Sequence, residues 1–210
     1  MKNKNNYNIC IWGDSITWGA WDYEKGGWVN RLHLSLDAKQ KLPEVTNLGI
    51  SGNTTKDLLK RFLCEAEARN PGIVIFAIGI NDSYLEQIGG TEIVSVQDFE
   101  KNYEELLRQA KQFTDKIILI GLTWYDENSN SQRSEHYYYN KRIQQYDTIV
   151  EALAEKHKLS YVNLFELLRE KDFEDGLHPN SEWHRKIFEK VMSTLLPLIG
   201  KREAGREIEI

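Results

Sequence analysis

The segment PGIVIFAIGIND, residues Pro71–Asp82, places a strand pattern directly before polar residues. Its centre, Ile73–Ile78, is a continuous apolar run rich in β-branched residues, which is typical of a strand buried on both faces. Gly79 ends the run, and the polar residues Asn81 and Asp82 follow it. The segment therefore predicts a central strand of a parallel sheet, with polar side chains just beyond its carboxyl end.

Strand patterns and helix patterns alternate along the rest of the chain. Besides Ile73–Ile78, the expected strands are Tyr7–Trp12, Glu44–Leu48, Ile117–Ile120 and Leu159–Leu164. The expected helices are Trp28–Leu36, a helix capped by Thr54 or Thr55 with Leu58, Leu59, Phe62 and Leu63 on its apolar face, Val96–Phe113, His136–His157 and Ser181–Leu196. Five strands separated by helices predict an α/β fold, with a parallel sheet covered by helices on both faces.

The composition fits one globular domain. The chain has 210 residues, of which 40% are hydrophobic and 28% charged, so we expect a single domain over residues 1–200 and a charged tail over residues 201–210. No apolar run approaches the roughly 20 residues that a membrane span needs. The net charge of −5 argues against nucleic acid or an anionic membrane as the main partner.

The start of the chain and the two cysteines predict a cytoplasmic location. Met1–Asn6 is basic and polar, and only Ile9–Trp12 is apolar before Gly13, so no signal-peptide core is expected. Cys10 and Cys64 are too few for a disulfide scaffold or a zinc ribbon, and each lies in a stretch with an apolar pattern. We therefore expect two buried, reduced thiols.

Polar or glycine-rich segments follow four of the five expected strands. Gly13–Ile16 follows the first strand, Asn47–Asn53 the second, Gly79–Asp82 the third and Asp175–Asn180 the fifth. Parallel strands end at the same edge of a sheet, and ligands of such folds bind beyond that edge. We therefore expect one pocket to collect residues from all four segments.

Ser15, in the first of these segments, is a candidate nucleophile, and a serine nucleophile needs a base. His178 is the histidine that follows the last strand, and Pro179 restricts its backbone to extended geometry. Asp175, three residues earlier, can reach Nδ1 of that ring and leave Nε2 for the serine. Ser15, His178 and Asp175 therefore form the predicted catalytic triad. The other histidines fall within helix patterns or at helix ends: His33, His136, His157 and His184.

An oxyanion formed at the serine needs hydrogen-bond donors. Asn81 offers its side-chain amide after the third strand. Gly52 offers a backbone N–H that a substrate oxygen can approach closely because no Cβ atom intervenes. The backbone N–H of Ser15 is the third expected donor, so Ser15, Gly52 and Asn81 make up the predicted oxyanion hole.

Taken together, these motifs resemble the SGNH/GDSL hydrolase superfamily. Gly13–Ile16 is similar to the GDSL signature, with isoleucine in place of its leucine. Ser15, Gly52, Asn81 and His178 match the four residues for which the superfamily is named. The likeness runs from the first motif through two further blocks, which are Gly79-x-Asn81-Asp82 and Asp175-x-x-His178-Pro179.

The resemblance implies a flavodoxin-like, three-layer α/β/α sandwich with a five-stranded parallel sheet. It also implies ester hydrolysis through an acyl-serine intermediate, without a metal or another cofactor. In this superfamily the aspartate of the Asp-x-x-His pair orients the histidine, a role that falls here to Asp175. Because the superfamily includes lipases, thioesterases, arylesterases and carbohydrate deacetylases, the resemblance does not fix the substrate.

Five further residues near the expected pocket are candidates for contact with substrate. Trp18 follows the nucleophile, and Trp124 and Tyr125 follow the fourth strand, so we expect them to line the acyl or leaving-group pocket. Asp14 and Asp82 are candidates as well. Each also has a structural interpretation, since an aspartate in a turn commonly hydrogen-bonds the local backbone.

The expected function is that of a serine esterase that releases a small acyl group, such as acetyl, from a small-molecule ester. A thioesterase or lysophospholipase of the same fold is one alternative. A second is a metal-dependent phosphoesterase that would use Asp14, Asn81, Asp82 and His178 as ligands, although such sites usually have more histidines and carboxylates. The third is a non-catalytic α/β domain that binds a ligand.

Overall fold

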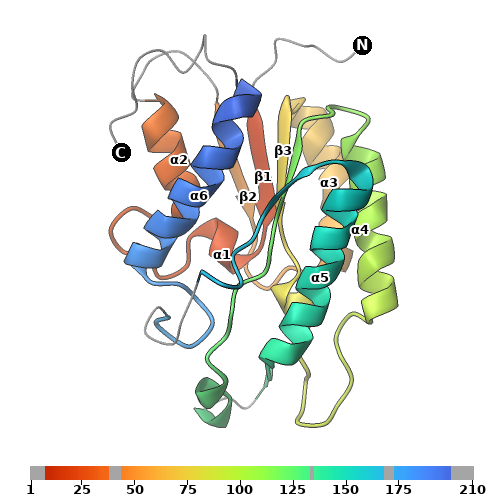
Figure 1. The fold of residues 1–210 in the computed structure, drawn as a ribbon, viewed down its shortest axis with the longest axis vertical. Helices are drawn as coiled ribbons and strands as arrows, with labels where there is room; N and C mark the ends of the chain where they lie inside the picture. The colour runs from red at the N-terminus through yellow and green to blue at the C-terminus, as the bar shows by residue number, and fades with distance from the viewer. Residues whose placement is uncertain (1–7, 38–43, 133–134, 168–172, 200–210) are drawn as a thin grey trace.

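The computed structural model describes residues 8–37, 44–132, 135–167 and 173–199, and these form an α/β fold in three layers (Figure 1). A sheet lies between two layers of helices, which confirms the predicted fold class. The expected charged tail, residues 201–210, and the polar start, Met1–Asn6, lie outside the described residues.

The sheet has five strands, all parallel, in the order β2-β1-β3-β4-β5. This is the flavodoxin-like order, in which the strand sequence reverses between β1 and β3. The carboxyl ends of β1 and β3 therefore flank the crevice where ligands bind in such sheets. The strands are β1 Ile9–Gly13, β2 Val45–Gly49, β3 Ile73–Ala77, β4 Ile117–Ile120 and β5 Ser160–Val162.

Helices cover both faces of the sheet (Figure 1): α2 and α6 lie on one face, and α3, α4 and α5 lie on the other. In the described part of the chain, no helix is both long enough and apolar enough to cross a membrane. The helices are α1 Ser15–Trp18, α2 Trp28–Asp37, α3 Thr55–Arg69, α4 Val96–Ala110, α5 Asn140–His157 and α6 Ser181–Ile199, with short 3₁₀ helices η1 Ile80–Asp82 and η2 Glu127–Gln132.

The two central strands anchor the core. All five residues of β1 and the first four of β3 are buried. Trp12 on β1 contacts Phe62 on α3, with ring centroids 4.7 Å apart, and lies 6.2 Å from the ring of Phe76 on β3. Burying one such side chain contributes about 1.5–3 kcal/mol. The two strands whose ends border the crevice are thus part of the buried core.

Helix α5 begins at Asn140 rather than at His136, where the sequence pattern placed its start. His136 has a positive φ of 64°, which is incompatible with a right-handed helix. Tyr137 forms two backbone hydrogen bonds with Leu85, at 2.8 and 2.9 Å. The segment before α5 is therefore tied to the loop after η1, and the backbone is still extended at Tyr139, directly before the helix.

The two cysteines differ in exposure, which corrects the expectation that both are buried. Cys10 on β1 is fully buried, and burial raises the pKa of its thiol to about 11. Cys64 on α3 is exposed. The inward stripe of α3 runs through Leu58, Phe62 and Ala66 at a spacing of four residues, so Cys64, two positions from Phe62, points outward.

Alkylation tests this difference. We expect native protein treated with iodoacetamide at pH 8 to take up one carbamidomethyl group, at Cys64, whereas unfolded protein takes up two. Peptide mass spectrometry gives the sites, and the Cys64→Ser variant serves as the control that stays unmodified while folded. Modification of Cys10 in native protein at the rate of Cys64 would contradict the packing of β1 described above.

Candidate active site

Ser15 and His178 lie within hydrogen-bond distance of each other, although 163 positions separate them in the sequence. Ser15 opens α1 directly after β1, and His178 lies in the loop before α6. The distance from Nε2 of His178 to Oγ of Ser15 is 2.8 Å, and Nδ1 lies 2.8 Å from Oδ2 of Asp175. The structure therefore brings the three residues of the predicted triad into one chain of hydrogen bonds.

A tight turn between β1 and α1 positions Ser15. Gly13 ends β1, and a Cβ atom there would lie only 2.1 Å from Oγ1 of Thr17, so no larger residue fits. The carboxylate of Asp14 accepts the backbone N–H of Ile16 at 3.0 Å and caps the first turn of α1. The turn holds the serine hydroxyl at the surface of the sheet's carboxyl edge, with 7% of the residue exposed.

Asp175 is held as a carboxylate. Its Oδ1 accepts the backbone N–H groups of Leu177 at 3.0 Å and of His178 at 2.8 Å. Burial alone would raise the pKa of Asp175, but the hydrogen bond and charge of His178 and these backbone donors hold the pKa well below its ordinary value. Because the carboxylate is ionised, the ring proton belongs on Nδ1, and the lone pair of Nε2 faces the serine.

The predicted oxyanion donors lie in two neighbouring loops. Gly52 has a φ of 77°, and a Cβ atom there would meet no atom within 4 Å, so its surroundings are open. Among the described residues its backbone N–H has no hydrogen-bond partner. The amide of Asn81 donates to the carbonyl of Asn53 at 3.1 Å, and its Oδ1 accepts the hydroxyl of Tyr138 at 3.0 Å. These two bonds fix which end of the Asn81 amide carries the donor.

Arg61 on α3 ties these loops to the nucleophile turn. Its guanidinium donates to the carbonyls of Gly13 and Leu48, at 3.3 and 2.9 Å, and to Oδ1 of Asn53 at 2.9 Å. A further bond of 2.8 Å joins it to Glu65, one turn along the same helix. The planar, five-donor guanidinium can bridge the ends of β1 and β2 in this way, which an ammonium group could not.

Asp14 and Asp82 lie inside the protein, which favours the structural interpretation of both residues over contact with substrate. Asp14 is 3% exposed and caps α1, and burial raises its pKa to about 6 against the opposing effect of its hydrogen bonds. Asp82 is fully buried and accepts both the backbone N–H and the hydroxyl of Thr55. Burial raises the pKa of Asp82 to about 7. Both carboxyl groups hold loops together.

The predicted aromatic residues occupy three different environments. Trp18 on α1 is 60% exposed, three positions after Ser15. Trp124 is half-buried and packs against Phe173, with ring centroids 5.9 Å apart, just before the Asp175 loop. Tyr125 is fully buried, and its hydroxyl donates to Asn130 at 3.0 Å, so this residue supports a loop instead of lining the pocket.

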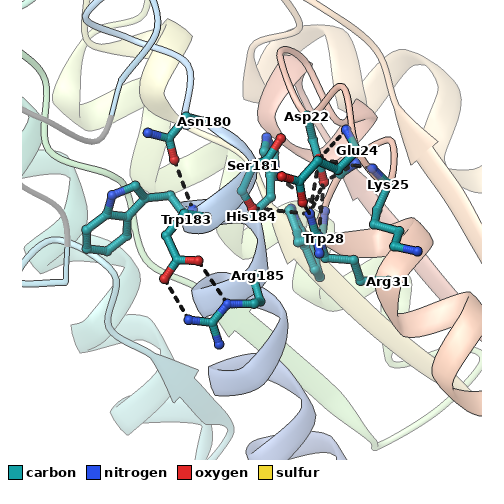
Figure 2. Close-up of polar contacts among 12 residues, drawn as sticks. Asp22, Glu24, Lys25, Trp28, Arg31, Asn180, Ser181, Trp183, His184 and Arg185 are labelled. Atoms are coloured by element: carbon teal, nitrogen blue, oxygen red, sulfur yellow. Dashed lines mark hydrogen bonds and ion pairs between the residues drawn. The ribbon is translucent and has the colours of Figure 1, made fainter.

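A buried network joins the loop after α1 to the start of α6 (Figure 2). Asp22 accepts the backbone N–H of Gly27 at 3.0 Å and two bonds from the guanidinium of Arg31, at 3.0 and 3.1 Å. Arg31 also donates to the carbonyl of Ser181 at 3.2 Å. His184 on α6 contacts the Ala20 carbonyl through Nε2 at 3.0 Å. The segment after the nucleophile is thus fixed to the helix that follows His178.

A serine, a histidine and an aspartate hydrogen-bonded in this order, beside candidate oxyanion donors, define the site of a serine hydrolase. Comparison with known proteins agrees. Residues 11–186 match the model of the GDSL-like lipase/acylhydrolase family. The chain therefore belongs to this family, and it is an acylhydrolase that acts on ester bonds.

Individual relatives are distant in sequence. The chain is 23% identical over 195 residues to esterase TesA of Pseudomonas aeruginosa, covering 91% of this chain and 89% of that protein. It is 27% identical over 122 residues to an acetylxylan esterase of Geobacillus stearothermophilus, covering 57% and 53%. The fold is similar to that of a solved lipase/acylhydrolase from Enterococcus faecalis, with a TM-score of 0.73, 24% identity and coverage of 90% and 95%.

The geometry does not favour a metal centre at this edge of the sheet. Within the described residues, no group of three or more histidine, cysteine, aspartate or glutamate side chains is placed to hold a metal ion. Asp82, a ligand in the phosphoesterase alternative, is enclosed with Thr55, and Oδ1 of Asn81 is occupied by Tyr138. These side chains would have to leave their partners before they could meet an ion.

The raised pKa of Asp82 predicts a pH-dependent loss of stability. The folded state keeps a proton on this carboxyl up to about pH 7, whereas the unfolded state releases it near pH 4. The contribution of Asp82 to the free energy of unfolding is thus complete below pH 4. It declines as the pH rises from 4 through 7, by up to about 1.4 kcal/mol per pH unit. We expect Asp82→Asn to remove this decline.

Urea unfolding of wild type and variant at several pH values measures the effect. From pH 4 to pH 7 the free energy of unfolding should fall more steeply for the wild type than for Asp82→Asn, because the variant lacks the contribution of Asp82 and keeps that of Asp14. Asp98→Asn, at an exposed position on α4, is the matched control and should follow the wild type. A constant difference between wild type and Asp82→Asn from pH 4 to pH 7 would contradict the assignment.

Proposed function

We propose that the chain hydrolyses small-acyl esters, such as acetyl esters, with Ser15 as the nucleophile, His178 as the general base and acid, and Asp175 as the group that orients His178. The observation that carries the proposal is the unbroken path from Oγ of Ser15 through the imidazole to the carboxylate, with both distances at 2.8 Å. Both distances are within the range of a working nucleophile and base.

In the first half of the reaction, Oγ of Ser15 attacks the ester carbonyl while Nε2 of His178 takes the hydroxyl proton. The tetrahedral intermediate collapses when the same proton passes to the alcohol oxygen, which leaves, and the acyl group stays on the serine. A water molecule then gives its proton to Nε2 and attacks the acyl-serine. The proton returns to Oγ as the carboxylic acid leaves, so the enzyme is restored.

The oxyanion of each tetrahedral intermediate is assigned to the N–H groups of Ser15 and Gly52 and the side-chain amide of Asn81. The open surroundings of Gly52 and the fixed orientation of Asn81 support this assignment. Such donors stabilise charge most when they are held in place before the reaction, and removal of one typically lowers turnover about a hundredfold to a thousandfold.

A small acyl group and a polar, ring-containing alcohol are supported by two observations. One is the sequence similarity to an acetylxylan esterase. The other is the exposed aromatic ring of Trp18, three positions after the nucleophile, which is 60% exposed. Flat aromatic surfaces suit sugar or aryl groups. The cytoplasmic location stays a prediction.

Replacement of Ser15 tests the assignment of the nucleophile. We expect Ser15→Ala to lower kcat for p-nitrophenyl acetate at least about a thousandfold, because the acyl-enzyme cannot form. Ser193→Ala, on an exposed face of α6, should keep wild-type activity. Equal rates of hydrolysis by Ser15→Ala and wild type would contradict the proposal.

A panel of substrates then ranks the substrate classes. It consists of longer p-nitrophenyl esters, acyl-CoA thioesters and acetylated sugars, all measured on the same preparation of the wild type.

Replacement of Tyr138 tests the role of Asn81. Loss of the Tyr138 hydroxyl frees the Asn81 amide to rotate, so we expect Tyr138→Phe to lower kcat about 10-fold and to change KM less than about twofold. Tyr146→Phe is the matched control, because it removes another buried tyrosine hydroxyl, one that bonds the Val94 carbonyl and not Asn81. If both variants lose kcat equally, general loosening of the core explains the effect and the Asn81 assignment fails.

A further inference from the structure

Trp21 contacts the predicted triad, although no sequence motif includes it. The residue lies in the loop between α1 and α2 and is 41% exposed. Its indole Nε1 lies 3.2 Å from Oδ2 of Asp175 and 3.1 Å from Nδ1 of His178. Its ring meets that of His178 edge-on, with centroids 6.0 Å apart and an interplanar angle of 86°. An indole N–H is a donor only, so it must serve one of these two atoms.

The carboxylate is the acceptor when the site is ready to react. In that state Nδ1 of His178 carries a proton and donates it to Oδ2 of Asp175, so Nδ1 has no lone pair to offer. The indole proton therefore goes to Oδ2. The donors to Asp175 then include the backbone N–H groups of Leu177 and His178 at Oδ1, and the imidazole and the indole at Oδ2. An ionised carboxylate has the lone pairs to accept all of these.

The backbone at Trp21 is held in an uncommon conformation. Its φ is 66°, in the left-handed region that bulky residues seldom occupy. Such a conformation persists only where the surroundings impose it. Here the residues on both sides are anchored. The Ala20 carbonyl lies 3.0 Å from Nε2 of His184, the Asp22 carboxylate accepts the backbone N–H of Gly27, and it also bonds Arg31 (Figure 2). The loop is therefore fixed so that the indole faces the Asp175–His178 pair.

We propose that Trp21 is a positioning residue of this active site: its indole N–H holds the Asp175 carboxylate in the orientation in which His178 presents Nε2 to Ser15. The proposal rests on the proposed function. The side chain of Asp175 is 37% exposed, so without the indole its Oδ2 would face solvent on this side. Water would then satisfy the carboxylate without fixing its direction. The indole N–H comes from the loop after α1, so its hydrogen bond also connects the segment that follows Ser15 to the loop that carries Asp175 and His178.

The test compares two replacements of Trp21 in the full chain. Trp21→Phe removes the N–H and shortens the ring. Incorporation of 3-benzothienylalanine at position 21 keeps the bicyclic shape and replaces the N–H with sulfur. For both, we expect kcat for p-nitrophenyl acetate to fall roughly 10-fold and KM to change less than about twofold. Tyr23→Phe, next to Trp21 and 77% exposed, should match the wild type in both kcat and KM.

Two outcomes would overturn the proposal. One is a benzothienylalanine variant with wild-type kcat, which would show that the indole N–H makes no contribution to the reaction. The other is a rise in KM with kcat unchanged, which would make the ring a substrate contact. If Trp21→Phe fails to fold, the benzothienylalanine variant, which keeps the bicyclic shape, still shows whether the indole N–H is needed. Failure here is distinct from failure of the proposed function, because the latter would appear as activity retained by Ser15→Ala.

Discussion

The hydrogen bond between Ser15 and His178 closes the site, and it joins residues from opposite ends of the sequence. Such a bond forms only if the end of β1 and the loop before α6 are held to within a fraction of an ångström. The parallel sheet brings Ser15 to the region of the site, since the turn after β1 lies where the strand order reverses between β1 and β3. The packing of Trp12 against Phe62 and Phe76 keeps that part of the sheet rigid.

Buried polar groups hold the loops around Ser15 in their exact positions. Arg61 joins the end of β1 to the loop that carries Gly52, and the Asp22–Arg31 pair joins the loop after α1 to the start of α6. Ion pairs of this kind contribute little to stability once the desolvation of both charges is counted. Their effect here is geometric: they fix loops from distant parts of the chain in one arrangement around the serine.

Much of this structure is predictable from sequence, because the signals are local. The apolar run Ile73–Ile78 and the glycine that follows it identify a central strand, and short polar motifs after successive strands identify Ser15, Asp175 and His178. Three features had no local signal. Tyr138 orients Asn81, but the sequence pattern suggested a helix from His136, whereas the residues before Asn140 form a bridge to Leu85. The contacts of Trp21 and the burial of Tyr125 depend on loops whose paths long-range hydrogen bonds set.

Labelling with a fluorophosphonate, followed by peptide mass spectrometry, tests most directly whether Ser15 and His178 act as nucleophile and base. The account predicts one adduct on Ser15 in the wild type, with the labelling rate reduced at least about a hundredfold in His178→Ala, because the serine then has no base. An adduct on a different residue, or equal labelling of Ser15 with and without His178, would contradict it.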